Sequence, residues 1–261
     1  MAPPLVTGGV VSGTAALRIV VLGRFRLVCA DREVQVPVTV QRLLALLAVC
    51  GPLGRPRVVA RLWPDADERH ARAALRTALW RVRTAGNGSC ADVLDRDEGV
   101  LRLAPDVVVD LDALRGQELP PTGATPTALR TWLDGEGGEL LPDWPDEWLV
   151  VERERVRQHR LHRLEQLVRV LMGQGEFAAA VDAALACLAL DSTRESAHRL
   201  LIAVHLAEGT VAEARRAYDR CRRWLWDELG VFPRDETRAL VDGPPSQRPA
   251  ASTSGAVQGR G

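Results

Sequence analysis

Residues 68–85 read ERHARAALRTALWRVRTA, and this stretch decides how the rest of the chain is interpreted. With about 100° of rotation per residue, its apolar side chains fall on one side of a helix and most of its arginines on the other. The apolar side consists of Ala71, Leu75, Ala78, Leu79 and Val82. The opposite side consists of Arg69, Arg72, Arg76, Trp80 and Arg83, with Thr77 and Thr84 beside them. The pattern predicts an amphipathic helix with one basic face.

The charge on this stretch is strongly one-sided, because five arginines stand against the single acid Glu68. A guanidinium group can donate two parallel hydrogen bonds to a phosphate or to the edge of a guanine. A charged helix face is more often only solvated surface, so the stretch alone does not separate the two interpretations. The elements predicted on either side of the stretch favour the interpretation that its arginines bind phosphate or guanine.

The elements predicted around the stretch follow the order sheet, three helices, hairpin. Short β-branched runs predict strands at 17–23, 25–29 and 34–36, and helices are predicted at 38–50 and 57–63. Asp65 and Glu68 are spaced like a capping box before the third helix. A hairpin at 92–94 and 100–103 follows it. This is the order of an OmpR-type winged helix, in which the third helix lies in the major groove of DNA.

The third helix therefore supplies the candidate DNA-binding residues. They are Arg69, Arg72, Arg76, Thr77, Trp80, Arg81 and Arg83. The hairpin turn at 95–99 is acidic apart from Arg96, and an acidic turn is repelled by phosphate, which argues against contact with the minor groove there.

The second half of the chain is predicted to be helical and repetitive. The segment 138–171 contains a long amphipathic helix, and GEFAAA at 175–180 aligns with GTVAEA at 209–214. The two segments are 34 residues apart, which is the tetratricopeptide period. Helices are expected at 176–190, 194–207 and 211–229, stacked as a curved array with small residues at the crossings. Those residues are Ala180, Ala184, Ala214 and Ala217.

The predicted fold class is mainly α, with an OmpR-type winged helix-turn-helix (α+β) followed by an all-α tetratricopeptide-like array. The winged-helix domain is expected at 17–115 and the array at 126–241, with a Gly/Pro/Thr-rich boundary at 116–127 and a short helix at 128–134. The tails 1–16 and 243–261 are predicted to be disordered.

Composition places limits on partners and compartment. The 261 residues contain 34 basic and 34 acidic side chains, so affinity for DNA has to come from a local patch. The cysteines are odd in number, without a CxxC pair, which indicates reduced thiols in a cytoplasmic protein. The N-terminus lacks the features of a signal peptide, and the longest apolar run, 43–50, is too short to span a membrane.

Catalytic and metal-binding patterns are not recognisable. His159 and His162 could share a helical face, and His198 and His205 are seven residues apart, but nothing completes a metal site at the usual spacing. Polar helix surface is the simpler interpretation of these histidines. No G-x-S-x-G is present, and no G-x-x-x-x-G-K-[ST] either, so we expect no enzyme, no cofactor and no nucleotide-binding module.

Several long segments resemble the Streptomyces antibiotic regulatory protein (SARP) family, in which the second part is called the bacterial transcriptional activation domain. The resemblance covers about residues 17–241. Its segments are LRIVVLG (17–23), QRLLALLAV (41–49), RLWPD (61–65), ARAALRTALWRVR (71–83), ELLPDWPDEWLVVERERVRQ (139–158), RESAHRLLIAVHLAEG (194–209) and DELGVFP (227–233).

The resemblance implies a DNA-binding transcription factor, usually an activator and often of secondary-metabolite gene clusters. Members of this family bind direct repeats of double-stranded DNA near a promoter, with a second protomer beside the first, and contact RNA polymerase. The resemblance implies the same partners for this chain. Two departures bear on DNA contacts: Val40 stands where the family often has Lys, and Trp80 or Ala74 where it often has a polar residue. The alternative function is a protein-interaction scaffold whose winged helix binds a partner protein instead of DNA.

Overall fold

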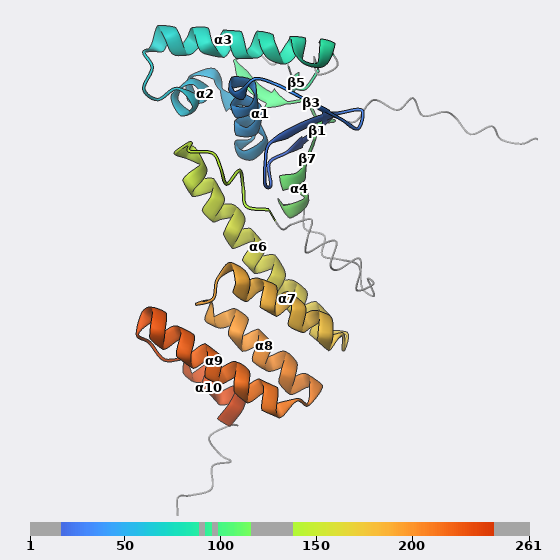
Figure 1. Ribbon diagram of the computed structural model, residues 1–261, viewed down its shortest axis with the longest axis vertical. Coiled ribbons are helices and arrows are strands. Elements are labelled where there is room, and N and C mark those ends of the chain that lie inside the picture. The colour runs from blue at the N-terminus through green and yellow to red at the C-terminus, as the bar shows by residue number, and fades with distance from the viewer. Residues whose placement is uncertain (1–16, 89–91, 96–98, 116–137, 243–261) are drawn as a thin grey trace, which may run out of the picture. The chain divides into compact units, whose positions relative to one another are not determined.

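The computed structural model describes residues 17–88, 92–95, 99–115 and 138–242, which fall into two compact units (Figure 1). The first unit contains the described residues up to 115 together with 138–160, and the second contains 161–242. The predicted tails, the predicted boundary at 116–127, the predicted helix at 128–134 and Arg96 lie outside the described residues.

The first unit opens with a four-stranded sheet in the order β3-β2-β1-β7. Its strands are β1 (Leu17–Val20), β2 (Arg26–Cys29), β3 (Arg32–Val34) and β7 (Val108–Val109). Strands β1, β2 and β3 are antiparallel neighbours, whereas β7 is parallel to β1. The predicted third strand at 34–36 was placed too late, because Ala30 and Asp31 both have positive φ and form a tight turn that lets pairing start at Arg32.

Three helices and a second sheet complete the winged helix. The helices are α1 (Val38–Cys50), α2 (Arg55–Leu62) and α3 (Glu68–Thr84). The second sheet has the order β4-β6-β5, with β4 (Leu53–Gly54), β5 (Leu94–Asp95) and β6 (Val100–Leu103). Strand β4 was not predicted, because a two-residue strand carries no alternating pattern. The hairpin β5–β6 is the expected wing.

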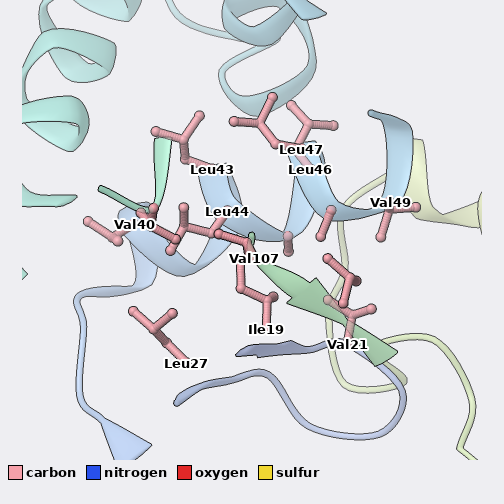
Figure 2. Packing of buried hydrophobic residues seen from close by; sticks show 14 of the residues in the cluster. Ile19, Val21, Leu27, Val40, Leu43, Leu44, Leu46, Leu47, Val49 and Val107 are labelled. Carbon is pink, nitrogen blue, oxygen red and sulfur yellow. The ribbon is translucent and has the colours of Figure 1, made fainter. Parts of the chain in front are cut away.

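Helix α1 forms the centre of the core of this unit (Figure 2). Apart from Val38, its leucines and valines are buried around most of its circumference, and they meet Ile19 and Leu27 of the first sheet, Val21 directly after β1, and Val107 near β7. Figure 2 labels Val40, Leu43, Leu44, Leu46, Leu47 and Val49 on this helix. A helix that is apolar on nearly all sides is stable only when other elements cover it from several directions.

The residues after the wing pack back onto the first sheet. Residues 108–109 form β7, and α4 (Asp110–Arg115) follows directly. The carboxylate of Asp110 accepts hydrogen bonds from the backbone N–H groups of Val21 (2.9 Å) and Leu22 (2.9 Å). Burial raises the pKa of Asp110, and these backbone donors partly counteract that effect. Asp110 thus fixes the end of the winged helix to the first sheet.

Residues 138–160 also pack into the first unit. Leu22 and Leu140 form a β-bridge, flanked by hydrogen bonds from Gly23 N–H to Glu139 O (2.8 Å) and from Leu141 N–H to Val21 O (3.1 Å). Leu140, Leu141 and Leu149 are fully buried in the same core as α1. The winged helix therefore draws part of its core from a segment that the sequence assigned to the helical array; the expected split into domains 17–115 and 126–241 stays a prediction.

The second unit is an array of antiparallel helical hairpins. It contains the later part of α6 (Trp148–Gly173), then α7 (Phe177–Leu190), α8 (Glu195–Glu208), α9 (Val211–Leu229) and α10 (Asp235–Asp242). Gly175 and Gly209, 34 residues apart, both have positive φ and precede α7 and α9. The small residues predicted at the crossings are buried, namely Ala180, Ala184, Ala214 and Ala217. The tetratricopeptide-like repeat is confirmed, and with it the fold class.

Candidate nucleic-acid interface

Helix α3 begins at a side-chain cap and packs one face against the core. The Asp67 carboxylate accepts a hydrogen bond from the backbone N–H of His70 at 3.0 Å, and this bond, with the His70 side chain, lowers the pKa of Asp67. The predicted cap was Asp65, so the structure moves the cap two residues along the chain. The reason is local: Trp63 to Ala66 form a turn, closed by a hydrogen bond from Ala66 N–H to Trp63 O.

The buried face of α3 is the predicted apolar face. Ala71, Leu75, Ala78 and Val82 are each less than 4% exposed. Leu79 is half-buried and packs against the same core. The packing leaves α3 along the margin of the first unit (Figure 1), so its other face is open to a partner.

All seven predicted site residues lie on the open surface of α3. Arg69, Arg72, Arg76, Thr77, Trp80, Arg81 and Arg83 are all exposed. Trp80 is 64% exposed, which is unusual for a side chain of its size and apolar character. A flat indole among guanidinium groups can stack on a planar group or cover an apolar one.

Ion pairing distinguishes these arginines from ordinary surface charges. Among the described residues, no carboxylate lies within salt-bridge distance of Arg69, Arg76, Arg81 or Arg83, whereas Arg72 pairs with Glu68 at 2.5 Å. Surface arginines on solvated helices commonly have acidic neighbours three or four residues away. We call this exposed face of α3, which carries the seven predicted site residues, the α3 stripe. The stripe is positively charged, and its one carboxylate partner among the described residues is Glu68 at its N-terminal end.

The threonines of the stripe contact the helix itself. The Thr77 hydroxyl donates to the carbonyl of Ala73 (3.1 Å), and the Thr84 hydroxyl to that of Arg81 (3.3 Å). Each hydroxyl oxygen keeps lone pairs for an external donor. An external acceptor would first have to replace the bond to the helix backbone.

One basic residue near α3 was missed by the sequence analysis. A groove of about 600 Å³ lies between α2, α3 and the wing, and Arg55 lines it together with Arg72 and Arg76. The backbone N–H of Arg55 donates to the carbonyl of Gly99 in the wing (3.3 Å), which fixes the start of α2 beside the hairpin. The sequence signal was the pair Arg55-Pro56, since proline favours the first turn of a helix.

The wing itself is described only at its base. Arg102 of β6 pairs with Asp95 of β5 at 2.8 Å, across the hairpin. Residues 96–98 lie outside the described part, so the expectation of a repelling wing turn stays a prediction.

The histidines do not gather into a metal site. Within the described residues, no three His, Cys, Asp or Glu side chains are placed to hold a metal ion together. His198 is 4% exposed, so interpreting it as helix surface was wrong. Its Nε2 is 2.8 Å from the carbonyl of Ser192, and burial lowers its pKa. His198 lies on the face of α8 that is buried in the array, together with Leu201 and Ile202, three and four residues further on.

The described helices include none that is both long and apolar enough to cross a membrane. Of the described cysteines, Cys50, Cys187 and Cys221 are free thiols. Burial raises the pKa of Cys187 and of Cys221 to about 12, so neither is a reactive thiolate.

The described residues form a winged helix with an exposed basic third helix, followed along the chain by a helical array. This combination is the architecture of one class of two-domain protein. Comparison with known proteins identifies the class. Residues 113–242 match the model of the bacterial transcriptional activator domain. The chain belongs to the Streptomyces antibiotic regulatory protein family.

The relatives with curated descriptions are regulatory proteins. The chain is 30% identical over 241 residues to the regulatory protein AfsR of Streptomyces coelicolor, and 28% identical over 239 residues to AfsR of Streptomyces griseus. These alignments cover 87% and 86% of this chain and 24% of each relative. The chain thus spans about a quarter of the length of the curated relatives that it matches.

A solved structure shares the architecture. Mycobacterium tuberculosis EmbR, determined in complex with a low-affinity phosphopeptide, superposes with a TM-score of 0.71 at 20% sequence identity. The superposition covers 91% of this chain and 67% of EmbR. At this identity the likeness establishes the fold.

Proposed function

We propose that this protein is a transcriptional regulator that binds double-stranded DNA with α3 in the major groove. The observation that carries the proposal is the exposed stripe of α3, whose arginines are open to solvent and mostly free of carboxylate partners among the described residues. Mid-helix Arg72 and Arg76 are best situated for base edges, and Arg69, Arg81 and Arg83 for phosphates. Trp80 and Thr77 contribute apolar and hydrogen-bonding contacts, and Arg55 adds a phosphate contact beside the wing.

The proposed regulator is an activator that contacts RNA polymerase and a second protomer through its helical array, in the cytoplasm. Support for protein contacts comes from the exposed aromatic groups at the end of α9: Trp226 stacks on Phe232 with ring centroids 4.8 Å apart, and both are more than half exposed. Exposed aromatic clusters of this kind favour protein interfaces. Direct repeats near promoters of secondary-metabolite genes are the proposed binding sites.

The alternative is a scaffold whose winged helix binds an acidic protein surface. The same stripe would serve it, because carboxylates also accept bidentate hydrogen bonds from arginine. DNA is favoured, since an array alone would suffice for a scaffold and would not need an Arg-rich third helix.

Footprinting of the full chain across promoters neighbouring its own gene tests the proposal. We expect protection of a repeated sequence, and a log Kd that rises with log salt at about 0.9 per neutralised phosphate. Equal, weak affinity for every DNA fragment together with tight binding to an acidic protein would reject DNA recognition in favour of the scaffold.

A further inference from the structure

A second concave site lies in the first unit, apart from the exposed stripe of α3. It is a pocket of about 980 Å³ between the start of α1, the end of α2 with the turn after it, and residues 143–148. Its volume lies at the upper end of the range of small-molecule sites. No residue of the proposed DNA-contacting set lines it.

Among the described residues, three tryptophans line this pocket: Trp63, Trp144 and Trp148. All three are half-buried, so their rings are held in place while part of each stays accessible. Trp144 packs against Phe25 with ring centroids 6.0 Å apart, and the indole N–H of Trp148 donates to Asp146 at 3.2 Å. All three tryptophans also pack against the core of the first unit, so the aromatic walls are held by neighbouring side chains, which reduces the cost of ordering them around a ligand.

The charges around the pocket are unevenly paired. Arg42 and Asp146 neutralise each other at 2.5 Å. Asp65, Asp143 and Glu147 also line the pocket; all three are exposed, and none has an ion-pair partner among the described residues. Among the described residues, the only other arginine of the lining is Arg61, which donates to the sulfur of Cys50 at 2.8 Å. Unpaired carboxylates thus outnumber unpaired guanidinium groups at the pocket.

We propose that this pocket binds a small organic cation, namely a protonated amine attached to an aromatic or other apolar body. The face of tryptophan is the side chain surface that attracts cations most strongly. The apolar body would displace water from the tryptophans and prolines of the lining, and the unpaired carboxylates would select the positive charge. An anion of the same shape would meet more repulsion than attraction, because three unpaired carboxylates stand against the single guanidinium group of Arg61.

The test uses the full chain and three probes of similar shape and different charge: phenethylammonium, 2-phenylethanol and 3-phenylpropionate. Binding is measured by calorimetry and by saturation-transfer NMR, without DNA, so the result is independent of whether the protein recognises promoters. We expect phenethylammonium to bind about tenfold more tightly than 2-phenylethanol, and 3-phenylpropionate to bind more weakly than either.

Two variants locate the site. Asp143→Asn with Glu147→Gln should reduce phenethylammonium affinity about fivefold and leave 2-phenylethanol unchanged. The matched control, Asp227→Asn with Glu228→Gln, removes two exposed carboxylates from α9 and should change nothing. Ala60→Trp fills the pocket from an exposed position on α2 and should abolish binding of all probes.

Three results would overturn the proposal. The first is no binding of phenethylammonium at millimolar concentration, and the second is equal affinity for the cation and its neutral analogue. The third is undiminished binding to the folded Ala60→Trp variant, which would put the cation at a different place on the chain.

Discussion

Asp146 accepts two hydrogen bonds from the guanidinium group of Arg42, at 2.9 Å from Nε and 2.5 Å from the terminal nitrogen. The two residues are 104 positions apart, and the Asp146 side chain is only 5% exposed. Arg42 belongs to α1, the central helix of the winged helix, and Asp146 to the segment before α6. This pair, with the bridge between Leu22 and Leu140, joins residues 138–160 to the core of the first unit.

Breaking this pair should destabilise the first unit. Arg42→Met leaves the Asp146 carboxylate buried without its partner, and we expect a loss of roughly 3 kcal/mol in the free energy of unfolding. Arg42→Met combined with Asp146→Asn should cost less than the sum of the single changes. The exposed pair of Arg24 and Glu33, at 3.0 Å, is the control, and Arg24→Met should cost less than about 1 kcal/mol. Urea denaturation measures all four; strict additivity would contradict a coupled pair.

Truncation tests the same relationship on a larger scale. A fragment ending at Arg115 loses Leu140, Leu141 and Leu149, each fully buried and each worth about 2 kcal/mol of burial. We expect it to melt well below a fragment ending at Arg160, and to bind DNA more weakly in a mobility-shift assay. Neither fragment should activate a reporter gene if the array is the activation surface. Equal melting temperatures for the two fragments would show that residues 138–160 do not stabilise the winged helix.

The sequence predicted the elements of this protein better than their partnership. Helix α3 and its two faces follow from a single period, and the 34-residue repeat follows from two similar segments, since both signals are local. The bridge of Leu140 to Leu22 and the pair of Asp146 with Arg42 are contacts across more than 100 residues. Nothing in the sequence near Leu140 or Asp146 indicates which distant residue each of them contacts.

The candidate site shows the same division. The exposure of Arg69, Arg72, Arg76, Trp80 and Arg83, with Thr77 beside them, followed from helix periodicity, whereas the same pattern did not assign Arg81 to a face. Arg55 was missed because its position depends on a backbone hydrogen bond to Gly99, in a different element of the fold. The cap was misplaced because Asp65 and Asp67 are equally good capping residues by type, and only the turn at 63–66 decides between them.

Arg76 is the most direct test of the proposed DNA contact. It is exposed near the middle of α3 and has no carboxylate partner among the described residues. Arg76→Ala should weaken specific binding by roughly 1–3 kcal/mol and relax preference at one base position. Arg72→Ala should behave similarly. Arg215→Ala, an exposed arginine on α9, is the matched control and should bind normally. A loss as large in the control as in Arg76→Ala would place the DNA-contacting surface outside α3.

Glu68 should weaken DNA binding by the same surface, because its carboxylate competes with DNA for Arg72. Its carboxylate pairs with Arg72 at 2.5 Å, and both side chains are more than 60% exposed. DNA has to displace Glu68 before a phosphate or base can take Arg72. Glu68→Gln removes the competing charge, and we expect about two- to fivefold tighter binding at low salt, with the gain shrinking as salt rises. Fluorescence anisotropy at several salt concentrations measures the effect. Unchanged or weaker binding would indicate that Arg72 points away from DNA in the complex.

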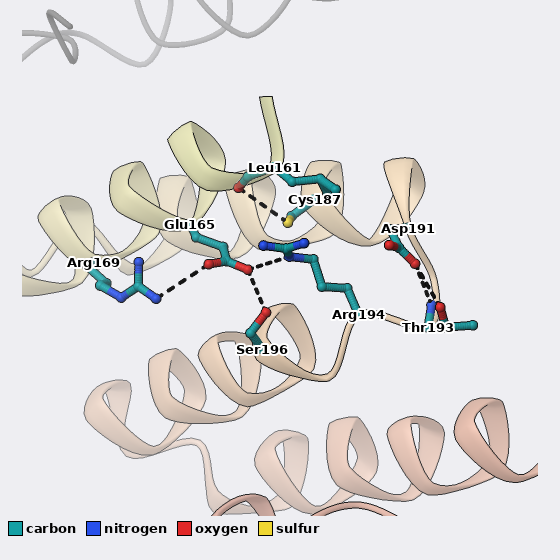
Figure 3. A network of polar contacts seen from close by, with 8 residues as sticks. All are labelled: Leu161, Glu165, Arg169, Cys187, Asp191, Thr193, Arg194 and Ser196. Carbon is teal, nitrogen blue, oxygen red and sulfur yellow. Dashed lines mark hydrogen bonds and ion pairs between the residues drawn. The ribbon is translucent and has the colours of Figure 1, made fainter. Parts of the chain in front are cut away.

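Glu165 should make the stability of the second unit depend on acid. Its carboxylate accepts hydrogen bonds from Arg194 (2.6 Å) and Ser196 (2.6 Å) and lies 3.5 Å from Arg169 (Figure 3). The side chain is 7% exposed. Burial raises the pKa of Glu165, but the bonds from Arg194 and Ser196 and the charge of Arg194 outweigh burial, so the net pKa is lower than its ordinary 4.5.

The sign of the pH dependence follows from this shift. Because the pKa of Glu165 is lower in the folded protein than in the unfolded chain, the ion pair stabilises the fold fully above about pH 4.5, and that contribution is lost as pH falls through the folded-state pKa. Glu165→Gln should cost roughly 3 kcal/mol near pH 7, and the difference from the wild type should narrow below pH 4.5. Asp182→Asn, on the exposed face of α7, is the control and should leave stability nearly unchanged at neutral pH. Urea denaturation followed by circular dichroism between neutral and acidic pH gives the comparison, and a difference that stays constant with pH would show that Glu165 acts by packing and not by charge.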